Sequence, residues 1–187
     1  MYHYSCDNQW SNPIQQQWGY QNWNHNPYQD NLGFNDWYNN WNPFFGGDQI
    51  RDHGGEPFVV NIEHAAERNN TFRTALWTGE HFQVTLMSIG VGEDIGLENH
   101  PNTDQFLRIE QGQGLVQMGD RQDQLYFQRH VSEDDAIMVP AGKWHNLINT
   151  GHRPLKLYSI YAPPEHPYGT VHGTKAVAMA TEENHYK

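Results

Sequence analysis

Twelve histidines occur among the 187 residues, and only their spacing can separate metal ligands from proton carriers and polar surface residues. Two segments stand out together: residues 92–112, and residues 134–149 with their Pro-Ala-Gly turn. Each segment combines a histidine, His100 in the first and His145 in the second, with carboxylate and amide side chains. Imidazole nitrogens and carboxylate or amide oxygens can all bind a divalent cation, so metal chemistry is the first hypothesis for these segments.

The two segments resemble the paired motifs of the cupin superfamily. Its first motif is a Gly, five residues, His-x-His, three or four residues, Glu, six residues and Gly; its second is a Gly, five residues, Pro-x-Gly, two residues, His, three residues and Asn. The spacing fits at every step, and the identical residues are Gly92, His100, Gly112, Pro140, Gly142, His145 and Asn149. Three residues depart from the motifs: Glu98 replaces the first His, Gln105 the Glu, and Asp134 the leading Gly of the second motif.

This resemblance implies an all-β fold, a double-stranded antiparallel β-helix or jelly-roll barrel, with one divalent metal ion. Carried over by position, the ligands are Glu98, His100, Gln105 and His145, with Glu98 also a possible catalytic base. The substituted oxygen ligands suit a borderline-hard ion. They leave the metal open among Mn, Fe, Zn, Ni, Co and Cu.

Strand alternation supports the ligand assignment independently. Glu98 and His100 share parity and therefore one face of a strand, and Gln105 shares its face with Leu107, whereas Asp104 takes the opposite face. Gln105 is thus predicted to point into the barrel and Asp104 out of it. Polar groups inside an apolar barrel are costly unless something satisfies them, and a cation does so.

The remaining candidate residues have more than one interpretation. Tyr158 could donate a proton or a hydrogen bond if it faces inward, and otherwise packs in the core. Trp144 could pack at the barrel mouth or form a substrate wall. We expect four histidines without ligand spacing on the surface or in the tail, with a pocket cap as the alternative for the last: His130, His152, His166 and His172.

Short runs rich in β-branched and aromatic residues, separated by Gly, Asn, Asp or Pro, predict strands from residue 58 to residue 162. The first predicted run is 58–62, and the last, 155–162, alternates with period two. Residues 163–172 are too rich in Pro and Gly for regular structure, and we expect them to pack as an extended tail across the barrel. The one helix-prone stretch is 174–183. We place the cupin domain at residues 55–180.

Residues 1–47 have a different composition. Asn and Gln dominate, five of the seven tryptophans occur here, and Ile14 and Leu32 are the only aliphatic residues apart from Met1. Such a segment cannot bury enough apolar surface to fold, so we predict a disordered N-terminal arm. It either self-associates or anchors the protein, since interspersed aromatics and amides are adhesive, or it is a passive tail. Its amino-acid composition, and nothing else about it, is similar to that of bacterial spore-coat proteins.

The net charge of -11 disfavours nucleic acid and anionic membranes as partners. No apolar run approaches a membrane span and no signal peptide is recognisable, so a cytoplasmic location is expected, with the spore coat as the alternative. Cys6 cannot form an internal disulfide. We also expect a homodimer, because short cupins commonly pair and Phe106, Arg108 and Glu110 form an outward-facing row on one strand.

Residues 57–179 also resemble short bacterial cupins labelled mannose-6-phosphate isomerase-like, in phrases such as VPAGKWHN and GTVH. True isomerases of that name are larger and have a phosphate-binding site that has no counterpart in this sequence. The resemblance implies a metal-dependent enzyme acting on a small polar substrate such as a sugar or keto acid, isomerase-like or dioxygenase-like. The alternative is a non-catalytic binding or structural cupin whose metal only stabilises the barrel.

Overall fold

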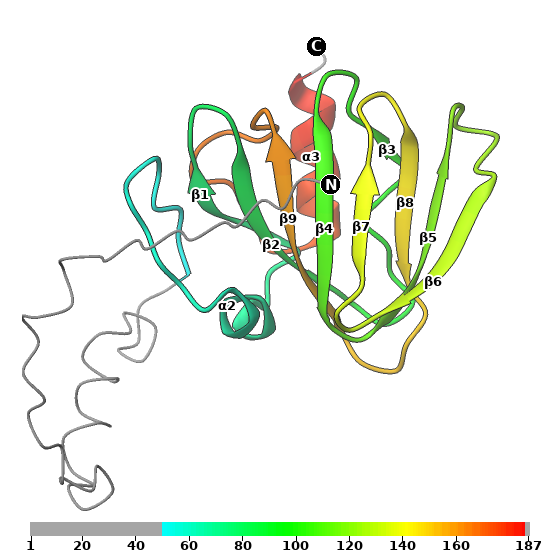
Figure 1. Ribbon diagram of the computed structural model, residues 1–187, viewed down its shortest axis with the longest axis horizontal. Coiled ribbons are helices and arrows are strands. Elements are labelled where there is room, and N and C mark those ends of the chain that lie inside the picture. Colours follow the sequence, from blue (N-terminus) through cyan, green and yellow to red (C-terminus); the bar gives the residue numbers. More distant parts are fainter. Residues whose placement is uncertain (1–49, 186–187) are drawn as a thin grey trace, which may run out of the picture. The chain divides into compact units, whose positions relative to one another are not determined.

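The computed structural model describes residues 50–185, which form two antiparallel sheets and two helices (Figure 1). The predicted arm, residues 1–47, lies outside the described residues. The elements are α2 (Ile62–Arg68), β1 (Arg73–Thr78), β2 (Gln83–Ile89), β3 (Glu98–Asn99), β4 (Asp104–Gln111), β5 (Gln113–Gly119), β6 (Phe127–Ser132), β7 (Ala136–Val139), β8 (Trp144–Asn149), β9 (Leu155–Ala162), β10 (Val171–His172) and α3 (Lys175–His185).

The two sheets confirm the predicted all-β jelly-roll. One sheet has the strand order β10-β1-β2-β9-β4-β7 and the other has the order β3-β8-β5-β6. Neighbours in each sheet that are not consecutive in the chain, such as β9 with β2 and β4, require the crossovers of a jelly-roll. These crossovers bring the two metal-motif segments, which are far apart in sequence, into one barrel.

The apolar core lies between the sheets, where alternate side chains of each strand point inward. On β9 the buried set Leu155, Leu157, Ser159 and Tyr161 follows the predicted alternation. The core is made of residues from both sheets and α3: Phe72, Met87, Ile89, Ile95, Leu107, Ile109, Val116, Met118, Val131, Ile137, Val139, Leu147, Leu155, Leu157 and Ala178. Toward Tyr161 the inward residues become polar, so one end of the barrel interior is apolar and the other can hold a site.

The prediction of a strand at residues 58–62 is wrong. The chain there stays outside both sheets, and Asn61 caps helix α2 because its Oδ1 accepts a hydrogen bond of 3.0 Å from the His64 N–H. Ala65 and Ala66 of this helix pack on Leu86 and its neighbours, in a cluster separate from the main core. The helix expected at 174–183 is confirmed as α3. Neither helix of the described chain is long and apolar enough to cross a bilayer.

Phe106, Arg108 and Glu110, the residues predicted to lie at a dimer interface, belong to a strand inside the sheet. β4 runs between β9 and β7, and Glu110 is only 3% exposed. Arg108 donates to Glu110 at 2.8 Å and to Asp134 at 2.6 Å, so these charges pair within one chain. The homodimer stays a prediction.

Candidate metal centre

The two motifs meet where β3 pairs with β8. Their register places Glu98 directly opposite His145, and residues opposite each other on neighbouring strands have side chains in contact range. The turn before β8 is fixed to the first motif, because the Gly142 N–H donates to the His100 carbonyl at 2.8 Å and Asn99 Nδ2 donates to the Gly142 carbonyl at 2.6 Å. Gly142 has a φ of 79°, which a glycine adopts without strain.

Three donor side chains converge at this point. Glu98 Oε1 lies 3.4 Å from His100 Nε2 and 3.2 Å from His145 Nε2. One ligand atom from each of the three residues lies within 4.8 Å of the others. Both imidazoles are buried, at 6% exposure for His100 and 1% for His145. The structure therefore brings together three of the four predicted ligands.

The outer nitrogen of each imidazole is already engaged. His145 Nδ1 lies 3.0 Å from the Lys143 carbonyl oxygen, which can only accept, and His100 Nδ1 lies 3.1 Å from Glu165 Oε1. If both Nδ1 atoms carry the proton and donate, the Nε2 atom of each neutral ring has only a lone pair. Both lone pairs then face the Glu98 carboxylate, which is also an acceptor, so acceptor faces acceptor. A cation among the three atoms relieves this opposition, and a carboxylate or carbonyl behind each imidazole is the usual support of a metal-binding histidine. The residues fit a divalent metal ion.

The electrostatics without an ion point the same way. Burial alone would raise the pKa of Glu98. Hydrogen bonds from His100 and His145 outweigh burial, as does the charge of Arg73, and the pKa lies well below its usual range. The Arg73 Nη2 atom is 3.6 Å from Glu98 Oε2. Burial lowers the pKa of His100, but Glu165 and Glu98 outweigh burial and raise it to about 9. The cluster therefore holds a proton where a metal ion would otherwise lie.

Gln105 faces inward as predicted and Asp104 is exposed. Gln105 Nε2 donates to Ser159 Oγ at 3.1 Å, whereas Gln105 Oε1 is buried and has no hydrogen-bond partner among the described residues. An oxygen without a partner in this interior is suited to a ligand. Its role as the fourth metal ligand stays a prediction.

Tyr158 does not reach the cluster. It lies on the face of β9 opposite Tyr161, with its ring centroid 6.0 Å from that of Phe106, and packs against the apolar cluster under α2. The condition for its catalytic role, an inward side chain, is not met. The inward tyrosine is Tyr161, which lies edge-on to His100 at 5.5 Å between ring centroids. Burial raises its pKa to about 12, so this hydroxyl keeps its proton.

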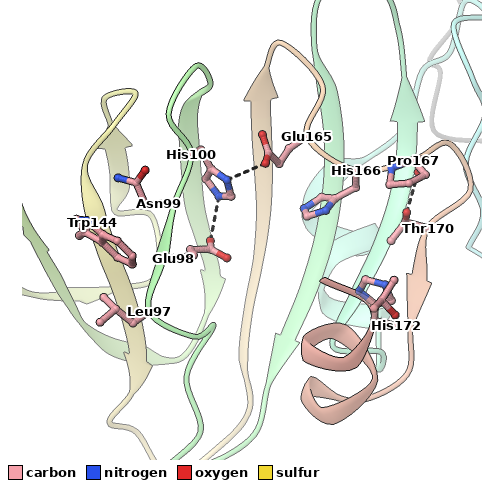
Figure 2. Close-up of a pocket in the computed structure, with 11 residues that line it drawn as sticks. Leu97, Glu98, Asn99, His100, Trp144, Glu165, His166, Pro167, Thr170 and His172 are labelled. Carbon is pink, nitrogen blue, oxygen red and sulfur yellow. Dashed lines mark hydrogen bonds and ion pairs between the residues drawn. The ribbon is translucent and has the colours of Figure 1, made fainter. Parts of the chain in front are cut away.

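A cavity of about 840 Å³ opens beside the ligands. Its lining comes from β3 and its flanking residues, β8, the segment after β9, β10 and α3. It consists of Leu97, Glu98, Asn99, His100, Trp144, Glu165, His166, Pro167, Thr170, His172 and Thr181. Figure 2 shows Glu98 and His100 between Trp144 on one side and His166 and His172 on the other. This volume is in the range of small-molecule sites, and Trp144 fits the substrate-wall alternative.

His166 and His172 lie in the predicted tail, and of the alternatives for His172 the pocket position fits, whereas a surface position does not. His172 is 7% exposed, and both imidazoles line the cavity because β10 pairs with β1 and draws the Pro-rich segment over the barrel. Sequence reasoning also missed Arg73 and Glu165. Arg73 follows Phe72 at the start of a strand run, where a charged residue on an inward face is a usable signal. Glu165 carries no local signal, since only the tertiary fold brings it to His100.

Comparisons with known proteins agree with this geometry. The Cupin domain family matches residues 85–161. The chain is 71% identical over 134 residues to the uncharacterized protein YrkC of Bacillus subtilis (strain 168), covering 72% of each protein. It is 40% identical over 116 residues to the uncharacterized protein L612 of Acanthamoeba polyphaga mimivirus, covering 61% of this chain and 70% of that protein.

A solved structure shows the same fold at high identity. The crystal structure of a Bacillus halodurans protein is 71% identical, with a TM-score of 0.70, and the match covers 70% of this chain and 99% of that one. With the family match and the paired motifs, these relatives show the family. The chain belongs to the cupin superfamily.

Proposed function

We propose that the protein is a metal-dependent enzyme that acts on a small polar substrate such as a sugar or keto acid, in an isomerase-like or dioxygenase-like reaction. One observation carries the proposal: Glu98 and His100, two of the three residues of the cluster with His145, line a cavity of about 840 Å³. A structural ion is closed off by four protein ligands, whereas a catalytic site keeps a position open for water or substrate. The finer resemblance to mannose-6-phosphate isomerase-like cupins is part of the same proposal.

The donor set supports a catalytic ion. Two imidazoles and one carboxylate leave one position free on a four-coordinate ion, and with Gln105 as a further ligand two positions stay free on a six-coordinate ion. When bound there, a divalent ion supplies a Lewis acid that polarises a substrate oxygen or holds the substrate for reaction with O2. Mn, Fe, Zn, Ni, Co and Cu are all compatible with these ligands.

The chain's own residues have separate roles in this proposal. Glu98 stays ionised because of its lowered pKa, which suits a metal ligand. Its position in the lining of the cavity also makes it the candidate base for a proton of a substrate carbon or hydroxyl. Glu165 accepts from His100 Nδ1 and thereby sets the tautomer that directs His100 Nε2 to the ion. Trp144 and Leu97 provide an apolar wall that excludes water from one side of the cavity.

The second candidate is a non-catalytic cupin, for example a spore-coat component anchored by residues 1–47. Its support is the Asn-, Gln- and Trp-rich composition of that arm, which is unusual for a freely diffusing enzyme. The open cavity beside the ligands favours the enzyme. Homodimerisation and self-association of the arm belong to either candidate.

Metal analysis followed by a turnover screen tests the proposal. The purified full chain should contain about one transition-metal ion per molecule, and NMR of aldose–ketose exchange or O2 consumption with keto acids should detect turnover that a chelator abolishes. His145→Ala should lose both metal and turnover, whereas the matched control His130→Ala, at an exposed position of β6, should lose neither. A protein that takes up metal, binds substrates and turns over none of them supports the non-catalytic candidate.

A further inference from the structure

The side of the cavity away from Trp144 is built from the segment after β9 and from β10. His166, Thr170 and His172 line it, and Figure 2 shows both imidazoles there. His166 Nε2 and His172 Nδ1 are buried, and neither has a hydrogen-bond partner in the described part of the chain. Buried polar atoms are normally paired, so two unpaired nitrogens in one wall indicate a partner that comes from outside the protein.

The wall is held in place by the barrel. Gln83 is fully buried; its Nε2 donates to the His166 carbonyl at 2.9 Å and its Oε1 accepts from the His166 N–H at 3.0 Å. The Tyr161 ring lies edge-on to His166 at 5.0 Å between centroids. His172 is fixed by pairing with Arg73 in the sheet. A wall that is positioned before a ligand arrives costs little ordering entropy on binding.

Tyr161 lies next to both His166 of this wall and His100 of the metal cluster, so its distances to them limit how far apart the two histidines are. Its ring centroid is 5.5 Å from that of His100 and 5.0 Å from that of His166, so the two histidines are at most about 10.5 Å apart. One small molecule can contact both ends. A ligand that coordinates an ion at the Glu98 cluster therefore presents its far end to His166 and His172.

The wall of His166, Thr170 and His172 offers no positive charge to a phosphate. Burial and the charge of Arg73 lower the pKa of His166 to about 2, and the same causes lower the pKa of His172, so both rings are neutral. No Lys or Arg belongs to the described residues that line the cavity, whereas Glu98 and Glu165 do. Phosphate recognition relies on Arg, Lys or helix N-termini. A neutral imidazole instead offers one donor and one acceptor, which matches a hydroxyl group.

We propose that the wall of His166, Thr170 and His172 recognises the hydroxyl groups of a neutral polyhydroxylated substrate, an unphosphorylated sugar or polyol, whose other end lies at the metal ligands. This rests on the proposed function and narrows its substrate class. Thr170 Oγ1 donates to the Pro167 carbonyl at 2.7 Å, so its oxygen is left to accept from a ligand hydroxyl. Each group in the wall can then pair with a hydroxyl without a change of charge.

Calorimetric titration of the full chain loaded with Zn²⁺ tests the inference. The probes are five- and six-carbon aldoses and their polyols, including D-mannose and D-mannitol, together with D-mannose 6-phosphate. We expect at least one neutral probe to bind and the phosphate to bind no more tightly than mannose. His166→Phe and His172→Phe should each weaken the neutral probe about tenfold, since each removes a buried hydrogen bond. His130→Phe, at an exposed strand position, is the matched control and should bind as the wild type does.

Metal content is measured on every variant, which separates the two proposals. A chain that takes up no metal refutes the proposed function. A chain with about one ion that binds none of the neutral probes, or binds the phosphate at least tenfold more tightly than mannose, refutes the hydroxyl wall. If a phenylalanine variant unfolds, His166→Asn and His172→Asn replace it: an amide also donates and accepts, so they should retain metal and weaken the probe less than tenfold. Wild-type affinity in properly folded phenylalanine variants would also overturn the inference.

Discussion

Binding of a divalent ion to the metal-free protein should release a proton at neutral pH. The physical reason is His100, whose pKa of about 9 means that the metal-free cluster carries a proton on this imidazole at pH 7. An imidazole must lose that proton from Nε2 before it can bind the ion. Metal uptake and deprotonation of His100 are therefore coupled.

The size of the effect follows from the pKa. At pH 7, two units below the pKa of His100, about 1% of the sites are neutral, so the apparent affinity is about 100-fold weaker than at high pH, or about 3 kcal/mol. Between pH 7 and pH 9 the apparent affinity should rise about tenfold per pH unit and then level off. The free histidine pKa of about 6.5 alone would place this change at lower pH.

Isothermal titration calorimetry in two buffers of different protonation enthalpy measures the protons released per ion. We expect about one at pH 7. Glu165→Gln is the control that identifies the proton: the Glu165 carboxylate is a main cause of the raised pKa, so its removal should lower both the proton release at pH 7 and the pH dependence. A proton count near zero in the wild type, or an affinity that is flat from pH 7 to pH 9, would refute this account of the cluster.

Three further predictions follow. In the metal-free protein the raised pKa of His100 contributes stability that is complete below about pH 6.5 and is lost as pH rises through about 9, on the order of 3 kcal/mol, and thermal melts should show this loss only without metal. His145→Ala should reduce bound metal in elemental analysis to near zero, whereas Asp104→Asn, which keeps an acceptor for the Ala141 N–H, should leave it unchanged; metal lost in the Asp104 variant and kept in a Gln105 variant would place the inward face one residue away. Deleting residues 1–47 should change the melting temperature by less than about 2 °C and reduce light-scattering mass; a large drop in melting temperature would make the arm part of the fold.

The sequence was informative wherever short-range pattern and motif spacing agreed. Gln105 is buried and Asp104 exposed, as strand parity predicted, and Glu98 lies opposite His145 although 46 residues separate them. The alternation of β9 also predicts which tyrosine points into the barrel: Tyr161 shares the face of the inward leucines, and Tyr158 does not. Tyr158 takes the packing alternative that the sequence left open for it, and its catalytic alternative required an inward side chain.

Other features depend on tertiary contacts that no local pattern encodes. His166 and Glu165 lie in a Pro-rich segment without periodicity, and they reach the cavity because Gln83 and β1 hold that segment over the barrel. Helix α2 follows two β-branched residues, Val59 and Val60, which favour a strand, and the Asn61 cap is a local signal for the helix. These are the places where long-range packing overrides local propensity.

The cavity has two parts with different origins in the chain. The metal ligands belong to the stretch that matches the Cupin domain family, which ends at Tyr161, and the facing histidines come after it. Mutation can therefore alter His166 or His172 during evolution, and with them the molecule that is accepted, while the metal ligands stay unchanged. Relatives that align only over the matched stretch can therefore keep the proposed metal ligands and still differ in the residues that follow their last barrel strand.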